Sequence, residues 1–367
     1  MRNLILIDAN NLAMRAAFAF SLSVVKEISL EAHPDEEPLV FPTGVLHGFF
    51  KSIVMLRRFY PHYYMVIAWD GGYAQRLEIT KTAVANRIIP ETYKENRRHQ
   101  APSREIEAFI KQKPILRAVI QSTNIPQVLV KDEEADDVIA SYVRQLSPQC
   151  DDILLCTNDR DYFQLLQPNV RIYRNDTIMD MNAFIAEFGI TPTQWLDIAA
   201  FQGDSGDNIF GVPGWGEKTS LEKIKLHGSA EKVLKVFHEE FDPLREKFPD
   251  LNGEEIAQLQ NLKSPTGKPK YPDVHEKLPF TGVALALENK KIKKPKSTVL
   301  ALMFEERVRL AKQLKTMYSD LSIPLLPGWD GSPSWNRGLK DQFLQFCDKY
   351  KLAEVSKDAD TICAVQP

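Results

Sequence analysis

Residues 201–219 read FQGDSGDNIFGVPGWGEKT and join an acidic turn to a glycine-rich loop. Asp204 and Asp207 stand three residues apart, so a helical or turn backbone aims both carboxylates at one point. Carboxylates placed in this way repel each other unless a cation lies between them, and oxygen ligands suit Mg²⁺ or Mn²⁺. The glycines that follow allow a backbone to approach a phosphate, which the N–H groups of a helix start can bind. The stretch suggests an enzyme that cuts a nucleic-acid backbone, although an acidic turn before an ordinary glycine-rich loop explains it equally.

The composition limits the class of protein. The 367 residues are 44% hydrophobic, which is enough for two domains or for one domain with a large appendage. The net charge is −3, so a nucleic-acid partner has to be held by local basic patches. The four cysteines form no CxxC pair, which predicts reduced thiols in a cytoplasmic protein. The first strand is too short for a signal peptide and no apolar run approaches about eighteen residues, so we expect no membrane partner.

Acidic residues also follow the predicted strands. The apolar runs at 4–7, 65–69 and 153–156 are typical of buried parallel strands. Each run is followed within three residues by an acidic side chain, where open α/β sheets build their sites, although a single such residue is more often a turn or cap residue. A haloacid-dehalogenase-type phosphatase begins in the same way, but it needs a second Asp where this chain has Asn10. The acidic residues after these strands are Asp8, Asp70, Asp159 and Asp161.

A further acidic cluster precedes the helix that we predict over 138–146. Glu134, Asp136 and Asp137 open this helix, and the helix dipole alone stabilises acidic groups at a helix start. Three such charges exceed what capping requires. Alternating strands and helices predict a mostly parallel α/β sheet. We therefore expect the carboxylates after the strands, those at the start of this helix, and Asp204 and Asp207 to converge at one edge of the sheet. Like charges at ~4 Å cost several kcal/mol even at an effective dielectric near 20, so the cluster requires metal ions to stay ionised.

Residues 76–117 differ in charge from the rest of the chain. They carry ten Arg and Lys against five Glu. A locally basic, helix-compatible stretch in an acidic protein predicts contacts with backbone phosphates, and a solvated helical face is the alternative.

Seven segments in residues 1–230 resemble the 5′ nuclease superfamily. This superfamily comprises flap endonucleases and 5′–3′ exonucleases of bacteriophage and bacterial type, including the N-terminal domain of bacterial DNA polymerase I. The later helix at 306–321 resembles the closing part of the same nuclease core. The segments are LILIDANN at 4–11, TGVLHGFF at 43–50, VIAWDG at 66–71, YKENR at 93–97, EADDVIA at 134–140, LLCTNDRDYFQLL at 154–166 and GDSGDNIFGVPGWGEKT at 203–219.

The resemblance implies a PIN-like, three-layer α/β fold with a mostly parallel central sheet, a helical arch and a helix-turn-helix element. We expect a catalytic domain over 1–200 that includes the arch at about 76–117. A helix-turn-helix DNA-binding region over 201–325 follows, with a basic insertion at 251–300 that aligns with no part of the family. A C-terminal helix and a polar tail occupy 326–367.

The resemblance also implies two Mg²⁺ ions, for which Mn²⁺ substitutes. Asp8, Asp70, Asp136 and Asp137 match the first metal site and Glu134 lies between the sites. The second site matches Asp159, Asp161, Asp204 and Asp207. Lys94 and Arg97 match basic residues of the arch, and with Glu134 and Asp136 they are the expected catalytic residues. In the family the helix-turn-helix element grips duplex phosphates and often holds a K⁺ ion. The expected nucleic-acid contacts are Arg76, Lys81, Lys94, Arg97, Arg98, Gly211, Gly214, Gly216, Lys218 and Thr219.

The implied activity is structure-specific hydrolysis at 5′ flaps, nicks or duplex 5′ ends of DNA or RNA–DNA hybrids, including RNA primers. The products would carry 5′-phosphates. The alternative is a structure-specific DNA-binding protein with non-catalytic metals, which would carry Asn, Lys or Ala at one of the acidic positions. A PIN-type endoribonuclease would lack the arch and the glycine-rich element. Since the chain ends at Pro367 without a polymerase domain, we expect a free-standing, monomeric nuclease of phage or bacterial type with replication proteins as candidate partners.

Overall fold

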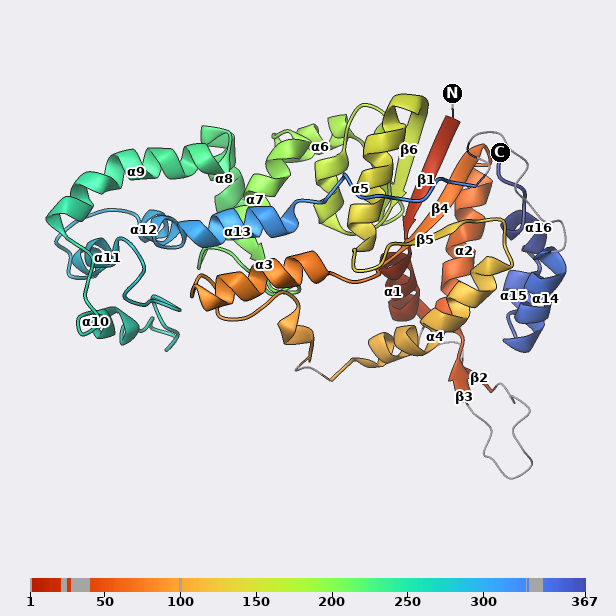
Figure 1. Ribbon diagram of the computed structural model, residues 1–367, viewed down its shortest axis with the longest axis horizontal. Helices are drawn as coiled ribbons and strands as arrows, with labels where there is room; N and C mark the ends of the chain where they lie inside the picture. The colour runs from red at the N-terminus through yellow and green to blue at the C-terminus, as the bar shows by residue number, and fades with distance from the viewer. Residues whose placement is uncertain (1, 21–24, 28–39, 99–100, 328, 330–338) are drawn as a thin grey trace. The chain divides into compact units, whose positions relative to one another are not determined.

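The computed structural model describes residues 2–20, 25–27, 40–98, 101–327, 329 and 339–367. The chain divides into two compact units, and each of them joins segments that are distant in sequence (Figure 1). The expected domains 1–200, 201–325 and 326–367 were defined by their expected roles, whereas these two units are defined by packing. The domain boundaries therefore stay a prediction. The sheet unit comprises Met1–Tyr73, Ala101–Met181 and Met317–Pro367, and the helical unit comprises Ala74–Gln100 and Asn182–Thr316.

The sheet unit is built on six strands in the order β5-β4-β1-β6-β7-β8. All neighbouring strands are parallel except β7 and β8. This confirms the predicted mostly parallel α/β sheet, and the carboxyl ends of its parallel strands lie at one edge. The strands are β1 (Arg2–Asp8), β4 (Tyr63–Trp69), β5 (Gln127–Leu129), β6 (Cys150–Cys156), β7 (Val170–Arg174) and β8 (Thr177–Met179), and β2 (Val25–Glu27) pairs with β3 (Val40–Pro42) in a separate ribbon.

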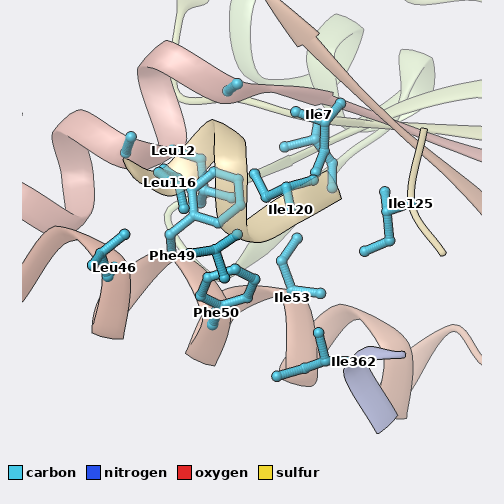
Figure 2. Close-up of a cluster of buried hydrophobic side chains, with 14 of the residues drawn as sticks. Ile7, Leu12, Leu46, Phe49, Phe50, Ile53, Leu116, Ile120, Ile125 and Ile362 are labelled. Atoms are coloured by element: carbon cyan, nitrogen blue, oxygen red, sulfur yellow. The ribbon is translucent and has the colours of Figure 1, made fainter. Parts of the chain in front are cut away.

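Helices cover both faces of this sheet. Alternate residues of a strand point to opposite faces, and Ile5 and Ile7 of β1 join an apolar cluster to which α1, α2 and α4 contribute (Figure 2). Leu4 and Leu6 are buried on the other face, where α5 contacts β1 and β4. Burial of both faces explains why the strands are continuous apolar runs. The helices are α1 (Ala9–Phe20), α2 (Gly44–Phe59), α4 (Arg104–Gln121) and α5 (Ala135–Leu146), with short 3₁₀ helices at Ser147–Gln149 and Arg160–Leu165.

The C-terminal residues complete the core of the sheet unit. We expected a polar tail after one helix, and this was wrong, because α15 (Ala353–Ser356) and α16 (Ala359–Ile362) follow α14 (Leu339–Lys349) and contact α2. The ring of Phe343 lies 5.3 Å from that of Phe50. The buried Gln366 side chain accepts a hydrogen bond from the backbone N–H of Met65 at 3.1 Å and donates one to its carbonyl at 2.9 Å. The tail therefore stabilises β4 instead of extending into solvent.

The helical unit contains the element that we predicted to be a helix-turn-helix. A two-stranded hairpin and a glycine-rich loop connect α7 to α8, and the two helices contact each other. No helix in the described residues is long and apolar enough to cross a bilayer. The elements of this unit are α3 (Ala74–Ala85), α6 (Met181–Phe188), α7 (Trp195–Gln202), β9 (Gly203–Asp204), β10 (Ile209–Phe210), α8 (Glu217–His227), α9 (Ala230–Lys247), α10 (Ile256–Gln260), α11 (Thr281–Glu288), α12 (Lys296–Met303), α13 (Glu305–Lys315) and 3₁₀ helices at Glu95–Arg98 and Pro192–Gln194.

Candidate metal centre and nucleic-acid interface

Asp8 is the last residue of the central strand β1, at the edge formed by the carboxyl ends of the parallel strands, and its side chain is buried. One carboxylate oxygen accepts a hydrogen bond from the backbone N–H of Asn11 at 3.0 Å. The other accepts hydrogen bonds from the hydroxyls of Tyr162 at 3.2 Å and Thr157 at 3.4 Å. Burial raises the pKa of Asp8 well above its usual range, and the negative charge of Asp70 raises it further. The surroundings of Asp8 therefore favour a nearby cation.

Asp70 follows β4 and connects the strand to the start of α5. Its Oδ1 accepts the backbone N–H of Ala135 at 2.9 Å, which caps the helix from a distant strand. Its Oδ2 accepts a hydrogen bond from the side-chain amide of Asn10. These two donors fix the orientation of the carboxylate at the edge of the sheet.

The start of α5 carries the predicted acidic cluster. Glu134, Asp136 and Asp137 each offer a carboxylate oxygen, and these oxygens all lie within 4.8 Å of one another. Glu134 and Asp137 are buried. An oxygen of Asp137 accepts the backbone N–H of Tyr318 at 2.7 Å, so the segment after α13 helps to orient the cluster.

Asp159 and Asp161 follow β6 at the start of a 3₁₀ helix. Asp159 is exposed, and its Oδ1 accepts the backbone N–H of Asp161 at 2.9 Å. Thr157 connects the end of β1 to the loop after β6. Its hydroxyl donates a hydrogen bond to Asp8 and accepts one from the backbone N–H of Asp159 at 3.1 Å.

The buried Tyr162 marks the point at which these segments converge. Burial raises the pKa of Tyr162 well above its usual range, and four carboxylates raise it further by their negative charge. These carboxylates come from the ends of β1 and β4, from the start of α5 and from the loop after β6. They are Asp8, Asp136, Asp159 and Asp70.

The side chains at this edge fit a divalent cation. Carboxylate oxygens are the ligands that Mg²⁺ and Mn²⁺ prefer. The side-chain oxygen of Asn10 is buried and has no hydrogen-bond partner among the described residues, although its amide nitrogen donates to Asp70. A buried oxygen acceptor that lacks a donor is costly unless a cation or water satisfies it. The roles of the individual residues as metal ligands remain predictions.

Asp204 belongs to the helical unit and has a cationic partner. The Nζ of Lys315, from the end of α13, donates to its Oδ2, and the lysine is only 7% exposed. The backbone N–H of Gly206 donates to the other oxygen at 2.8 Å. Burial raises the pKa of Asp204, but Lys315 and the backbone donors outweigh this effect, and the net pKa is lowered.

Asp207 lies three residues further and contacts the predicted catalytic cations. The guanidinium of Arg97 donates to its Oδ1, and the Nζ of Lys94 lies 3.8 Å from the same oxygen. The hydroxyl of Tyr93 donates to Oδ2 at 3.2 Å. The backbone of Lys94 is left-handed, with a φ of 56°, and its N–H donates to the carbonyl of Asp207 at 2.9 Å. The YKENR turn and the acidic turn are thus locked together.

The glycine-rich loop after this turn is shaped by close backbone contacts. A Cβ on Gly211 would lie 2.4 Å from the carbonyl oxygen of Phe201. Gly214 has a φ of 81° and follows Pro213 in a turn closed by the N–H of Trp215 and the carbonyl of Val212 at 3.0 Å. This is the geometry of a type II turn, which requires a left-handed residue at its third position.

The predicted nucleic-acid contacts have different surroundings. Arg76 is only 3% exposed, and its guanidinium group donates to the carbonyls of Leu314 and Thr316. This burial contradicts its predicted contact with nucleic acid, because the side chain stabilises the end of α13 instead. Lys81 is exposed and pairs with Glu78 at 2.9 Å. The predicted contacts that remain exposed besides Lys81 are Arg97, Arg98, Gly214, Gly216 and Lys218, while Lys94, Gly211 and Thr219 are half-buried.

Three partners of the acidic residues were not assigned a role from the sequence. Lys315, Tyr93 and Tyr162 lie far along the chain from the carboxylates to which they donate. The family segments at 93–97 and 154–166 contain Tyr93 and Tyr162 but do not indicate these contacts. Asn10 was used only to exclude a phosphatase, yet it orients Asp70.

The comparisons with known proteins agree with this fold. A sequence model described as "5'-3' exonuclease, N-terminal resolvase-like domain" matches residues 3–189, and one described as "5'-3' exonuclease, C-terminal SAM fold" matches residues 190–263. The chain belongs to the 5′–3′ exonuclease family.

Two relatives illustrate the extent of the similarity. A "5'-3' exonuclease" of Aquifex aeolicus is 26% identical over 309 residues, which cover 83% of this chain and 92% of that protein. A "DNA polymerase I" of Bacillus caldotenax is 30% identical over 239 residues, which cover 64% of this chain and 24% of the polymerase. The chain thus matches about a quarter of the length of that polymerase.

Two solved structures share the fold at low sequence identity. A T5 5′-exonuclease with bound zinc has a TM-score of 0.56 and 18% identity, covering 99% of this chain and 100% of that one. A T5 D15 flap endonuclease complex with DNA and metal ions has a TM-score of 0.57 and 17% identity, covering 97% and 100%. This likeness confirms the PIN-like fold.

Proposed function

We propose that this protein is a divalent-metal-dependent nuclease that hydrolyses DNA at 5′ flaps, nicks and duplex 5′ ends, acting as a monomer. The acidic cluster at the start of α5, where oxygens of Glu134, Asp136 and Asp137 lie within 4.8 Å of one another, carries this proposal. It is supported by membership of the 5′–3′ exonuclease family.

Two Mg²⁺ ions are the proposed cofactors, and Mn²⁺ would replace them. When bound, such ions stabilise charge on the scissile phosphate and lower the pKa of water. Asp8, Asp70, Asp136 and Asp137 would hold the first ion, with Glu134 between the sites. Asp159, Asp161, Asp204 and Asp207 are the proposed ligands of the second.

The chain's own donors would hold the acidic groups in place during the reaction. Asn11 and Tyr162 orient Asp8, while Asn10 and the N–H of Ala135 orient Asp70. Such outer contacts fix ligand geometry and are often as sensitive to substitution as the ligands.

Lys94 and Arg97 are the proposed phosphate-positioning cations. Both lie beside Asp207, so the acidic turn holds them in a defined place before substrate binds. Cations aimed at a reacting phosphate stabilise the charge of the transition state. In-line hydrolysis would leave a 5′-phosphate and a 3′-hydroxyl, and RNA primers in RNA–DNA hybrids are a proposed second substrate.

The loop over residues 211–219 would bind the duplex part of the substrate. Backbone N–H groups at the start of α8 suit phosphate oxygens, and contacts of this kind position a duplex without reading bases. A K⁺ ion held by backbone carbonyls of this loop is part of the proposal.

The test is cleavage of a 5′-labelled flap duplex beside a blunt duplex and a single strand, in Mg²⁺ and in EDTA. We expect Mg²⁺-dependent release of the flap near the junction and no product in EDTA. Tight flap binding without product in Mg²⁺ would favour a DNA-binding protein with non-catalytic metals. Analysis of the product ends by ligation would test for the 5′-phosphate.

A further inference from the structure

A cavity of about 410 Å³ lies within the helical unit, between the glycine-rich loop and the segment after residue 262. Its volume falls in the range of small-molecule and cofactor pockets. Neither family match extends beyond residue 263, so one wall lies inside the matched part of the chain and the other outside it. The polar and backbone groups that line it come from Gly214, Ser264, Lys268, Lys270, Lys296 and Ser297.

The glycine-loop wall is fixed by Trp215. Its indole N–H donates to the carbonyl of Ser297 at the start of α12, at 3.0 Å. Its ring stacks on that of Phe201 with the centroids 4.5 Å apart. The turn at Gly214 and the start of α12 are therefore held beside each other by a buried aromatic side chain.

The opposite wall is a closed backbone turn. The N–H of Ser264 donates to the carbonyl of Lys268 at 2.8 Å, and the N–H of Gly267 returns to Ser264 at 2.9 Å. The N–H of Lys270 donates to the carbonyl of Leu262 at 2.8 Å. These bonds present the exposed Lys268 from a defined turn at the rim of the cavity.

The charged side chains that line the cavity in the described residues are Lys268, Lys270 and Lys296. Residues 263–296 contain nine lysines against three acidic residues, in a chain whose net charge is −3. Lys270 and Lys296 share one carboxylate, that of Glu288, at 2.6 and 3.7 Å. The exposed lysines of this segment besides Lys268 are Lys263, Lys277, Lys290, Lys291 and Lys293.

We propose that this cavity, the lysine cleft, binds backbone phosphates of duplex DNA and extends the contact made by the glycine-rich loop. Phosphate is favoured over an acidic peptide because the cleft adjoins a loop whose backbone suits phosphate binding. The lysines of the cleft would thus increase the length of duplex that the protein contacts. This inference rests on the proposed function, since it assumes that the loop over residues 211–219 contacts DNA.

The test measures binding of flap substrates by fluorescence anisotropy in EDTA, so that cleavage does not interfere. Lys268→Gln and Lys268→Glu are compared with Lys235→Gln and Lys235→Glu, since Lys235 is an exposed lysine of α9 that does not line the cleft. We expect Lys268→Glu to weaken binding roughly tenfold, and Lys268→Gln to reduce the slope of log K against log salt by about 1. The Lys235 variants should bind like the parent protein.

A series of shortened duplex arms locates the contact. The defect of Lys268→Glu should disappear once the arm is too short to reach the cleft. Equal binding by the Lys268 and Lys235 variants on the longest arm would overturn the proposal. Competition by inorganic phosphate with no dependence on arm length would instead indicate a site for small anions. Failure of the parent protein to cleave any substrate would count against the proposed function and leave the binding comparison readable.

Discussion

The acidic side chains of the two units have opposite electrostatic surroundings. In the sheet unit, burial and then Asp70 raise the pKa of Asp8, and its hydrogen-bond donors are neutral groups. In the helical unit, burial acts in the same direction on Asp204, but the buried Lys315 outweighs it and the pKa is lowered. Asp8 and Asp204 are both predicted metal ligands, yet their pKa values are shifted in opposite directions. The surroundings of Asp8 favour an added cation, whereas those of Asp204 include a cation of the protein.

Asp8→Asn, in the sheet unit, should have the largest effect on cleavage. We expect single-turnover cleavage to slow on the order of a thousandfold, because a lost metal ligand removes several kcal/mol of transition-state stabilisation. The melting temperature should stay the same or rise, because a buried carboxylate with an unfavourable charge is removed. Calorimetric titration with Mn²⁺ should show weaker binding. Unchanged cleavage would exclude Asp8 as a ligand.

Lys94→Ala should have the next largest effect and tests the cations of the helical unit. We expect single-turnover cleavage to slow by about a hundredfold, since one donor to the developing charge is lost. Affinity for the flap should change much less, because Arg97 also lies beside Asp207. Lys235→Ala is the control, since this lysine of α9 is exposed and is not among the predicted nucleic-acid contacts. An unchanged rate would remove Lys94 from the mechanism.

Asp204→Asn should destabilise the protein, in contrast to Asp8→Asn. The substitution removes the charged contact between Asp204 and the buried Lys315, which should cost about 2 kcal/mol, less than a fully buried pair because Asp204 is partly exposed. Urea denaturation measures this difference. The double variant Asp204→Asn/Lys315→Met should recover much of the loss, because it removes the buried charge as well. A single variant as stable as the parent would show that the pair contributes nothing to folding.

His238→Gln should give the smallest effect and tests charge pairing elsewhere in the helical unit. The ring nitrogens of His238 lie 3.0 Å from Asp242 and 2.7 Å from Glu305, which also pairs with Arg309. Burial lowers the pKa of His238, but its bonds to Glu305 and Asp242 outweigh this and raise it. The stabilisation is therefore fully present below the unfolded value of about 6.5 and is lost as the pH rises through the raised folded pKa.

The measurement for His238 is the free energy of unfolding of both proteins between about pH 5 and 8. The difference should stay below about 1 kcal/mol, because the ring is about one-third exposed, and should shrink toward the alkaline end. A difference that grows with pH would contradict the sign of the shift.

The sequence by itself determined the sheet and the acidic edge. The apolar runs that became β1, β4 and β6 each lead to an acidic residue, and parallel strands force their carboxyl ends to one side. Asp8, Asp70 and Asp159 could therefore be placed together without coordinates. The placement of the glycine-rich loop in a helix-turn-helix element came from the family resemblance of residues 203–219.

Only the tertiary structure decided which partners these residues have. Lys315 neutralises Asp204 from 111 positions away, and Tyr162 reaches Asp8 from 154 positions away. Arg76 belongs to a basic stretch yet is buried against α13, and Gln366 belongs to a polar tail yet binds β4. Periodicity and composition describe neighbours along the chain, whereas burial and charge pairing depend on neighbours in space.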